Sequence, residues 1–518
     1  MPTNSPLALL SLWCDLWCNK HLPASDPTTE TRRARWDTLL LFTALFAILA
    51  AARLCHTDIL WSDEDYHQAA ALQVLHGKAL YRDLWYDKPP LNVAVYLLFG
   101  ASGGALLRLA SAVYALLVCW SAFLFASRVW SRREGRIAAS LAAFFLIFYF
   151  PAAAITLEPD TLMILPQLWA VNFAWQRRFF AAGLVTGVAA LLNVKGVFVL
   201  AACVTFEWTE IGWLVLGFLI PNVAGFAWLA SQGELSGYAE QVWRWGLLYT
   251  GSGATLTGGL ARAAGWAGFH AALLLAAVLC WWEERASRMR FIGWTIISLG
   301  ASAIGGRFLP RYMEQLLPPL IVAASRGFTL AGALSNVGRR RVLEAALGAA
   351  LAIPLARFGP RYVLLAAETL QGKPHEWIDT AMDRDSRAAA RILSNQLRFV
   401  PAAPGSIPAP TLFVWGYRPN IFVYTGFVAA SRFWDSQPLT GVPADRHLLD
   451  ERPVDAAWAA ENRAELARSR PDFIADGLSL YNPRLDIHRY PDLAQWLAAY
   501  CEVGRTTGTI LYRRCDRR

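Results

Sequence analysis

The residues best suited to chemistry lie in one segment, directly after the first hydrophobic stretch of the chain. Three consecutive acids, Asp63, Glu64 and Asp65, are followed some twenty residues later by the run Asp87-Lys88-Pro89-Pro90. Charges between membrane spans must face water, each other or a polar ligand, because a charge left in hydrocarbon costs at least about 2.5–3.5 kcal/mol. Carboxylates beside a lysine at a membrane surface suit chemistry on a phosphorylated lipid.

Group transfer from a lipid phosphate needs a carboxylate that accepts the acceptor's proton, and positive charge or a metal that stabilises the leaving phosphate. Asp63 and the two acids after it are candidates for the first role. An acidic run also occurs where a loop is simply solvated. Its position directly after a span, with a lysine returning at a proline-rich turn, favours the catalytic interpretation. The side chains expected to support this site are Tyr66, Tyr81 and Asp87.

Lys88 precedes two prolines, and this context restricts its backbone. Proline locks its own φ and limits the residue ahead of it, so the ammonium of Lys88 is attached to a stiff turn. We interpret it as a ligand of a phosphate. The alternative is an interfacial lysine that extends to lipid headgroups, and the acidic neighbour Asp87 favours the first interpretation.

Further candidates occur later in the chain. Glu158-Pro159-Asp160 opens a hydrophobic stretch, where acids also serve as ordinary helix caps. Arg307 and Arg311 occur in a glycine-rich and proline-rich turn, and arginine suits bidentate contact with phosphate; headgroup contact is the alternative. Lys195 and Tyr312 complete the set as supporting residues.

The composition places these residues in a membrane protein. The chain has 518 residues, 55% of them hydrophobic, and its apolar runs recur until about residue 356, far beyond the needs of one soluble core. The net charge of +9 would suggest nucleic-acid binding in a soluble protein. Here the arginines collect in short loops between spans, as membrane orientation requires, so we expect no nucleic-acid partner.

We expect about eleven membrane-spanning helices, several of them shorter than the roughly 20 residues of a straight span. Asn193 and Lys195 interrupt the fifth and sixth, which could also form one broken helix. Leu91 to Ala101 is apolar but only about half the spanning length, so we place it along the membrane surface. The predicted spans lie near residues 38–54, 105–128, 137–153, 160–176, 179–194, 196–208, 211–230, 261–282, 291–305, 313–330 and 342–356.

Arginine clusters predict the orientation of these spans. With the amino terminus in the cytoplasm, five clusters fall on the cytoplasmic side, at residues 32–35, 132–136, 177–178, 285–290 and 339–341. A spanning segment at 91–101 would send every later cluster to the other side. The same assignment places all the other charged candidates at the outer face: Asp63, Lys88, Glu158, Asp160, Lys195, Arg307 and Arg311.

Three regions follow from this pattern. Residues 1–36 form a cytoplasmic segment, residues 37–365 a multi-span domain with a catalytic loop at 55–104, and residues 366–518 an outer domain of mixed polarity. Within the outer domain, the patterns predict an amphipathic helix at His375 to Asn395, strands at Thr411 to Trp415 and Asp472 to Ala475, and a helical stretch at Pro491 to Tyr500.

The cysteines add one structural expectation. Cys501 and Cys515 flank a stretch with the pattern of a hairpin, and a disulfide between them is expected if this end faces an oxidising compartment. Cys14 and Cys18 lack the second pair that a zinc site would need.

Taken together, the motifs resemble the C-type (GT-C) integral-membrane glycosyltransferases that use polyprenyl-phosphate sugars. This group includes protein mannosyltransferases, lipid A aminoarabinose transferases and bacterial lipopolysaccharide-sugar transferases. The resemblance covers about the first 330 residues, and its most specific part is the combination of Asp63-Glu64 with Lys88-Pro89-Pro90. The C-terminal region of the chain shows a weaker similarity to the tail of that group, at Val414-Trp415-Gly416 and from Tyr424 to Arg432.

The resemblance implies an all-α polytopic GT-C membrane core with a small C-terminal periplasmic α/β domain. It implies transfer of a hexose or pentose from a polyprenyl phosphate to an envelope acceptor, which could be lipopolysaccharide or lipid A, a glycan or a protein. The reaction would take place at the outer face of the bacterial inner membrane, among membrane lipids. The implied catalytic residues are Asp63, Glu64 and Asp160, with Glu158 as an alternative to Asp160, and the implied phosphate ligands are Lys88, Arg307 and Arg311.

At two positions of the site, the sequence departs from the pattern of that group. Asp65 extends the acidic pair, and Arg311-Tyr312 stands where many relatives have a histidine before the tyrosine. A histidine-dependent metal arrangement is therefore not implied. No cofactor is expected with certainty, and a divalent metal stays an open alternative.

Two other functions compete with the enzyme. A transporter or flippase of lipid-linked sugars would show charged or broken-helix features near the middle of the membrane and access to both faces. Here the distinctive charges gather on one face, beneath a sizeable domain. A catalytically silent scaffold is disfavoured by the presence of Asp63, Glu64 and Lys88. The donor sugar and the acceptor cannot be read from these residues.

Overall fold

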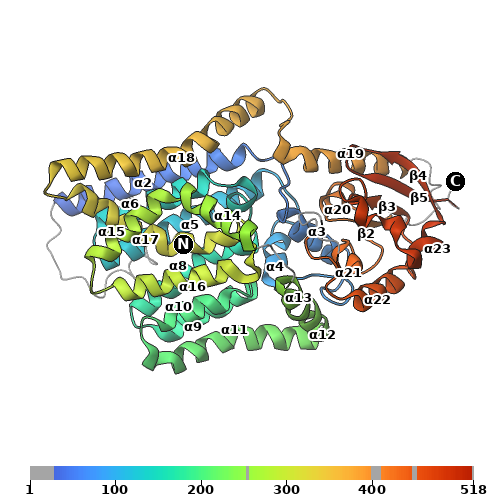
Figure 1. Ribbon diagram of the computed structural model, residues 1–518, viewed down its shortest axis with the longest axis horizontal. Coiled ribbons are helices and arrows are strands. Elements are labelled where there is room, and N and C mark those ends of the chain that lie inside the picture. The colour runs from blue at the N-terminus through green and yellow to red at the C-terminus, as the bar shows by residue number, and fades with distance from the viewer. Residues whose placement is uncertain (1–28, 252–255, 398–409, 446–451, 516–518) are drawn as a thin grey trace, which may run out of the picture. The chain divides into compact units, whose positions relative to one another are not determined.

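The computed structural model describes residues 29–251, 256–397, 410–445 and 452–515 (Figure 1). The chain divides into two compact units, residues 1–44 and residues 45–518, and α2 (Thr29–Leu54) begins in the first and ends in the second. Most of the predicted cytoplasmic segment, including Cys14 and Cys18, lies outside the described residues.

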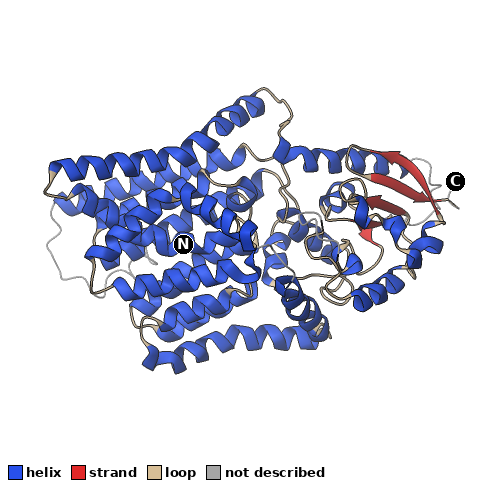
Figure 2. Cartoon of the chain, in the orientation of Figure 1, coloured by secondary structure: helices blue, strands red, loops and turns tan. Residues whose placement is uncertain are grey.

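Helices dominate the second unit up to residue 370 (Figure 2). The loop at 55–104 contains α3 (Glu64–Leu75) and α4 (Leu91–Leu97). The remaining helices of this part are α5 (Ala105–Val129), α6 (Arg132–Ile147), α7 (Pro151–Ala154), α8 (Pro159–Trp175), α9 (Phe179–Leu192), α10 (Gly196–Val204), α11 (Ile211–Ser231), α12 (Leu235–Tyr238), α13 (Trp245–Gly251), α14 (Leu256–Phe269), α15 (Ala271–Glu283), α16 (Arg288–Ala303), α17 (Leu317–Gly332) and α18 (Val337–Leu370).

Every predicted span coincides with one of these helices or with a helix pair. By length and composition, four helices within the described ranges could cross a membrane, and the pair α14 and α15, bent by 78°, would be a fifth. The other helices that match predicted spans are shorter; α6, α8, α9, α16 and α17 have 14 to 17 residues. The helical membrane core is thus confirmed in outline, and the number of eleven spans stays a prediction.

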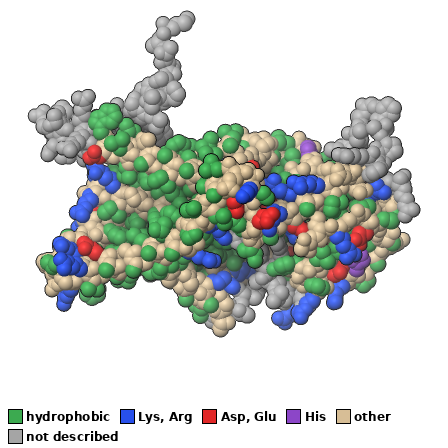
Figure 3. Space-filling view, turned by 90° about the horizontal axis from the view of Figure 1, so that it is seen from above, with side chains coloured by type: hydrophobic (Ala, Val, Ile, Leu, Met, Phe, Trp, Pro, Cys, Tyr) green, Lys and Arg blue, Asp and Glu red, His purple; other side chains and the backbone are tan. Residues whose placement is uncertain are grey.

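The surface of the helical part is apolar, as a lipid-facing surface requires. α18 exposes Val342, Ile353 and Val363. Figure 3, which views the molecule from the side where α18 lies in Figure 1, shows hydrophobic side chains over much of this face.

Small residues bring neighbouring helices into close contact. A Cβ on Gly183 of α9 would lie 2.1 Å from the carbonyl oxygen of Leu214, and a Cβ on Gly217 of α11 would lie 2.2 Å from that of Phe180. Membrane helices commonly pack in this way, because small side chains let two backbones approach.

The outer domain contains a five-stranded sheet in the order β2-β1-β3-β5-β4. β1 is parallel to both β2 and β3, whereas β5 is antiparallel to both β3 and β4. The strands are β1 (Thr411–Trp415), β2 (Val428–Ala429), β3 (Phe473–Asp476), β4 (Tyr500–Arg505) and β5 (Ile510–Arg514). The helices with four or more residues are α19 (Ala381–Gln396), α20 (Asn420–Thr425), α21 (Gln437–Thr440), α22 (Ala456–Leu466) and α23 (Ala494–Leu497).

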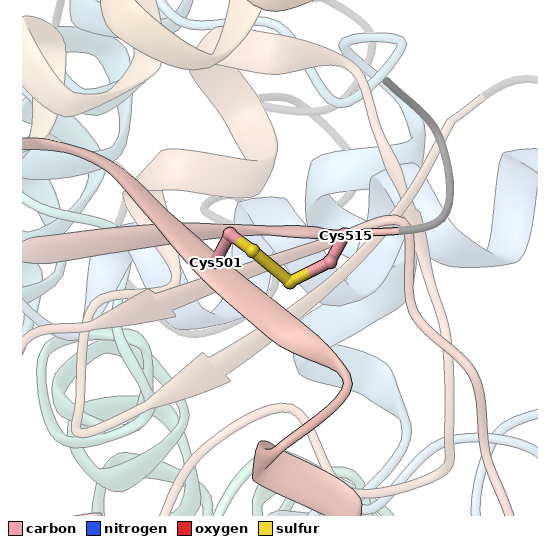
Figure 4. The surroundings of a disulfide bond; sticks show 2 residues. All are labelled: Cys501 and Cys515. Atoms are coloured by element: carbon pink, nitrogen blue, oxygen red, sulfur yellow. A yellow bond between two sulfur atoms is a disulfide. The ribbon is translucent and has the colours of Figure 1, made fainter.

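These elements confirm the small α/β domain predicted from the pattern. β1 has the predicted bounds, and β3 is shifted by one residue at each end. The helix predicted at 375–395 begins later in the structure: residues 375–377 are not helical, and α19 starts at Ala381 after a short 3₁₀ turn (Ile378–Thr380). Cys501 and Cys515 form a disulfide across the β4–β5 hairpin, with Cα atoms 5.3 Å apart (Figure 4).

The outer domain and the loop at 55–104 share one hydrophobic core. Tyr66 and Trp85 from the loop pack in the same buried cluster as Trp415 and Trp434 from the domain. The amide of Gln73 donates to the Phe427 carbonyl at 2.9 Å and accepts from the Ala429 amide at 2.8 Å, so it pairs with the edge strand β2. Segments that are far apart in sequence thus form one packed body.

Candidate active site

Asp63 lies immediately before α3 in an unusual backbone conformation. Its φ is 74° and its ψ is −38°, in a region that residues other than glycine rarely occupy. Its Oδ1 accepts a hydrogen bond of 3.0 Å from the hydroxyl of Tyr417, and its Oδ2 is paired with Nη1 of Arg311. The side chain remains 24% exposed. A carboxylate held from two sides and open on a third can still accept a proton.

Arg311 joins two of the predicted acids. Besides its pairing with Asp63, its Nη1 lies 3.8 Å from Oε2 of Glu158. Glu158 is 2% exposed, and its Oε1 has no hydrogen-bond partner among the described residues. Burial raises the pKa of Glu158 well above the usual carboxyl range, and the nearby charges of Asp160 and Glu314 raise it further.

Asp160 is held by the break between α9 and α10. Its Oδ1 accepts hydrogen bonds from Nζ of Lys195 at 2.8 Å and from Nδ2 of Asn193 at 3.1 Å. The Lys195 ammonium lies 3.8 Å from the centre of the Tyr312 ring, a cation–π contact. Asn193 has extended backbone angles between the two helices. Arg177, before α9, lies 3.1 Å from Glu207, after α10. The interruption that the sequence showed is thus a turn between two antiparallel helices, and the polar residues of this turn engage Asp160.

Lys88 stands on the proline turn as predicted. Its Nζ is 2.7 Å from Oδ2 of Asp87, and its carbonyl oxygen accepts a 2.7 Å hydrogen bond from the Tyr81 hydroxyl. The side chain is 42% exposed. It interacts electrostatically with Asp160 and Glu158, so the structure brings Lys88 to the same polar cluster.

Arg307 occupies a buried position beside this cluster. Its guanidinium carbon lies 3.7 Å from the centre of the Tyr249 ring, and its Nη2 donates to the Tyr249 carbonyl at 3.1 Å. Its own carbonyl accepts a 2.6 Å hydrogen bond from Nε of Arg262. Arg307 therefore shapes the loop that leads to Arg311, whereas Arg311 itself contacts the acids.

A cavity of about 310 Å³ lies against this loop. Its wall includes Phe308 and Pro310 from the loop, and the Pro310 carbonyl accepts a hydrogen bond of 2.5 Å from Tyr149. Two arginines, Arg262 and Arg357, also line it. The other lining residues are Phe150, Trp266, Phe269, Ile353 and Phe358. Apart from these two arginines, its walls are apolar and aromatic.

The structure separates Glu64 from the cluster around Asp63. Both carboxylate oxygens of Glu64 accept hydrogen bonds from Arg108, at 2.8 and 2.6 Å, and both side chains are almost fully buried. Arg108 also donates to the carbonyls of His56 and Ile59. This arrangement ties the start of α3 to α5, which favours a structural role for Glu64.

The remaining supporting residues form an aromatic layer. The Tyr66 ring stacks on Tyr86 at 5.4 Å, on Tyr417 at 5.6 Å and on Trp434 at 4.8 Å between ring centres. Asp65 is fully buried in the first turn of α3. Tyr81 holds the lysine turn, as described above.

Three residues of the site were missed at the level of sequence. Tyr417 follows β1, and the end of a buried strand was the signal that could have pointed to it. Glu314 is fully buried and accepts a 3.0 Å hydrogen bond from Thr161; its signal was an acid next to an apolar run. Arg108 was visible as a charge at the start of a predicted span.

No group of three or more His, Cys, Asp or Glu side chains is arranged to hold a metal ion within the described ranges.

Comparisons with known proteins agree with this fold. No protein-family model matches the sequence, and no curated protein matches it significantly. The chain is similar to the structures of ArnT from Cupriavidus metallidurans bound to undecaprenyl phosphate (16% identity, TM-score 0.55) and in the apo state (15% identity, TM-score 0.56). Each comparison covers 92% of this chain and 98% of the ArnT chain. The predicted resemblance to GT-C glycosyltransferases is thereby confirmed at the level of the fold.

Proposed function

We propose that this chain, which shares its fold with the glycosyltransferase ArnT, transfers a sugar from a polyprenyl-phosphate donor to an acceptor of the cell envelope. One observation supports this most directly. A partly exposed carboxylate, Asp63, lies beside Arg311 in a polar cluster that Lys88 and Asp160 also join. An acid that accepts a proton next to cations that bind phosphate is what this transfer needs.

In this mechanism Asp63 accepts the proton of the acceptor hydroxyl or amine as its oxygen or nitrogen attacks C1 of the sugar. The bond between C1 and the phosphate oxygen breaks, and the electron pair stays on the phosphate. Lys88 and Arg311 stabilise the negative charge that the leaving polyprenyl phosphate gains, because fixed cations matter most where the local dielectric is low. Lys195 keeps Asp160 oriented beside them.

Arg311 has a second role in this proposal. Without donor it neutralises Asp63. A bound phosphate competes for the same guanidinium, since arginine forms its strongest contacts with such anions. Donor binding would thereby loosen the ion pair and leave Asp63 available as a base.

The aromatic cavity beside residues 307–310 suits part of the polyprenyl chain. It is apolar, it lies against the loop that bears Arg311, and the structure of ArnT was determined with undecaprenyl phosphate bound. An isoprenoid chain would pass from the surrounding lipid to such a surface at little cost, because both are apolar.

The location that we propose is the bacterial inner membrane, with the site and the outer domain on the periplasmic side. The arginine clusters support this orientation. The disulfide between Cys501 and Cys515 also supports it, because disulfides persist in oxidising compartments. The acceptor could be lipopolysaccharide or lipid A, another glycan or a protein, and the sugar a hexose or a pentose.

A flippase of lipid-linked sugars is the second candidate. A transporter would show charged or broken-helix features near the middle of the membrane, whereas α9 and α10 are two antiparallel helices joined by a turn. The polar residues of this turn engage Asp160 within the cluster that includes Lys88, which supports the transferase more than a path across the membrane.

The test begins with deletion of the gene and mass analysis of envelope glycolipids and glycoproteins. Loss of one sugar substituent identifies the donor sugar and the acceptor. Inner membranes of the deletion strain then receive the purified variants together with the matching polyprenyl-phosphate sugar. Asp63→Asn should lower turnover by about 10²–10⁴-fold, the usual contribution of a positioned acid or base.

A matched control is Asp492→Asn, the same change at an aspartate of the outer domain that pairs with Arg463; it should keep wild-type turnover. Binding of undecaprenyl phosphate separates chemistry from folding. Asp63→Asn should bind this lipid at least as tightly as the wild type, because Arg311 loses one of the two carboxyl groups beside it. Near-normal transfer by a folded Asp63→Asn protein would exclude Asp63 as the base, and an unchanged envelope after deletion would contradict the transferase.

A further inference from the structure

The residue that holds Asp63 from the outer side belongs to the outer domain. The Tyr417 hydroxyl donates a 3.0 Å hydrogen bond to Oδ1 of Asp63, across a sequence separation of 354 residues. The Tyr417 ring also stacks on Tyr66, three residues after Asp63, with ring centres 5.6 Å apart. The outer domain thus touches both the proposed base and the helix that follows it.

Tyr417 stands at a special place in the sheet. It follows β1, and β1 lies between its parallel neighbours β2 and β3. In open sheets with parallel strands, functional sites form at the carboxyl ends of the strands where the order changes direction. The sheet therefore presents Tyr417 from the position that commonly bears functional residues.

The backbone on both sides of Tyr417 is closely constrained. Gly416 has a φ of 107°, and a Cβ there would lie 3.0 Å from the carbonyl carbon of Gly477. Arg418 is 4% exposed; its Nη1 is 3.1 Å from Asp385 and its Nη2 donates to the Gly508 carbonyl at 3.3 Å. A side chain mounted on so constrained a loop loses little freedom when it engages Asp63, which is the requirement for positioning.

The domain itself is fixed to the loop that bears Asp63. The Trp85 amide donates to the Arg432 carbonyl at 2.7 Å, and Nε1 of Trp434 donates to the Trp85 carbonyl at 2.5 Å. The Gln73 side chain pairs with the edge of β2 from the same side. Contact between Tyr417 and Asp63 is therefore part of a continuous packed interface.

We infer that the outer domain is part of the catalytic apparatus, with Tyr417 as a positioning residue that orients the Asp63 carboxylate toward the acceptor. This inference rests on the proposed function. Tyr417 donates one neutral hydrogen bond, so it fixes the carboxylate plane and leaves the charge of Asp63 in place. When the donor phosphate draws Arg311 away, Tyr417 is the contact that keeps Asp63 oriented.

The test compares Tyr417→Phe with Tyr500→Phe, which removes a hydroxyl of the same domain that donates to the Pro471 carbonyl at 3.0 Å. Phenylalanine keeps the ring that stacks on Tyr66. Tyr417→Phe should lower kcat about tenfold, the equivalent of one lost hydrogen bond of about 1.4 kcal/mol in the transition state, and leave KM for the donor within about twofold. Tyr500→Phe should match the wild type in both parameters.

A double variant tests whether Tyr417 acts through Asp63. In an Asp63→Asn background, Tyr417→Phe should have almost no further effect on turnover, because residues that act as one unit are not additive. Undecaprenyl-phosphate binding by Tyr417→Phe should equal that of the wild type, which shows that the protein is folded. Gly416→Ala is a second variant that displaces Tyr417 through its backbone, and it should lower kcat in the same way.

The outcomes separate this inference from the proposed function. If Asp63→Asn is inactive while Tyr417→Phe keeps wild-type kcat, or if the two changes are fully additive, the positioning role is wrong and the transferase stands. If Asp63→Asn itself retains transfer, the proposed base is wrong, and the role of Tyr417 falls with it.

Discussion

Asp63 has a backbone conformation that costs free energy to maintain. A positive φ at a residue other than glycine costs about 1–3 kcal/mol and persists only where the surrounding structure enforces it. Trp61 before it is buried, and the carboxylate is engaged by Tyr417 and Arg311. Strained backbone conformations are common at functional sites. This conformation directs the Asp63 side chain toward Arg311.

At the same scale, Lys88 allows a test of the donor site. Lys88→Gln should weaken binding of undecaprenyl phosphate and lower turnover, because the ammonium is partly exposed and interacts with the acidic cluster. We expect a loss of about tenfold or more in affinity, as for a charge-assisted hydrogen bond of about 1.5–3 kcal/mol. Lys88→Arg should restore only part of this, since the two cations differ in shape and reach.

The measurement is a titration of the purified variants with undecaprenyl phosphate. Lys78→Gln is the matched control, a lysine earlier in the same loop. Wild-type affinity in Lys88→Gln, together with wild-type affinity in the double variant Lys88→Gln Arg311→Gln, would place the phosphate elsewhere.

At the scale of elements, two junctions position the site. The turn between the antiparallel helices α9 and α10 supplies Asn193 and Lys195 to Asp160, and the start of α3 is tied to α5 by the ion pair of Glu64 with Arg108. Buried polar contacts at these helix ends thus hold the side chains of the site in place.

The pair of Glu64 with Arg108 leads to a prediction about stability. Glu64→Gln should destabilise the protein strongly, by about 3–5 kcal/mol, because it leaves the buried Arg108 charge without its partner. Thermal unfolding in detergent measures this. Glu502→Gln, which breaks an exposed pair with Arg505, is the control and should leave the unfolding temperature almost unchanged. A Glu64→Gln protein as stable as the wild type but inactive would instead assign Glu64 to catalysis.

At the scale of the whole molecule, orientation in the membrane decides which face does the chemistry. The prediction rests on the arginine clusters, which owe nothing to the resemblance to known enzymes. A cysteine at Arg133 should be shielded from an impermeant alkylating reagent in intact cells, and a cysteine at Ser236 should react. Both positions are exposed on the protein, so only the membrane distinguishes them.

The labelling needs a background in which the unpaired native cysteines are replaced, and permeabilised cells provide the control in which both positions react. The reverse pattern would place Asp63 and the outer domain in the cytoplasm. It would also contradict the location that we propose for the reaction.

Local patterns along the chain were enough to predict the elements and the residue types of the site. Long apolar runs specified the positions of the helices, and alternating or continuous apolar patterns specified β1 and β3, because hydrophobic periodicity is a local property. The proline turn at Lys88 and the interruption at Asn193 were visible for the same reason. The number of helices that cross the membrane was not determined, since several are shorter than a bilayer requires.

Which of these residues come into contact depends on how distant segments pack. The contact of Asp63 with Tyr417 spans 354 residues, and the pairing of Asp63 with Arg311 joins distant loops. Nothing in the local pattern distinguishes Glu64, which is paired with Arg108, from its partly exposed neighbour Asp63. The physical reason is that adjacent residues at a helix start point in different directions, so burial and charge partners are assigned by packing against distant segments and not by position along the chain.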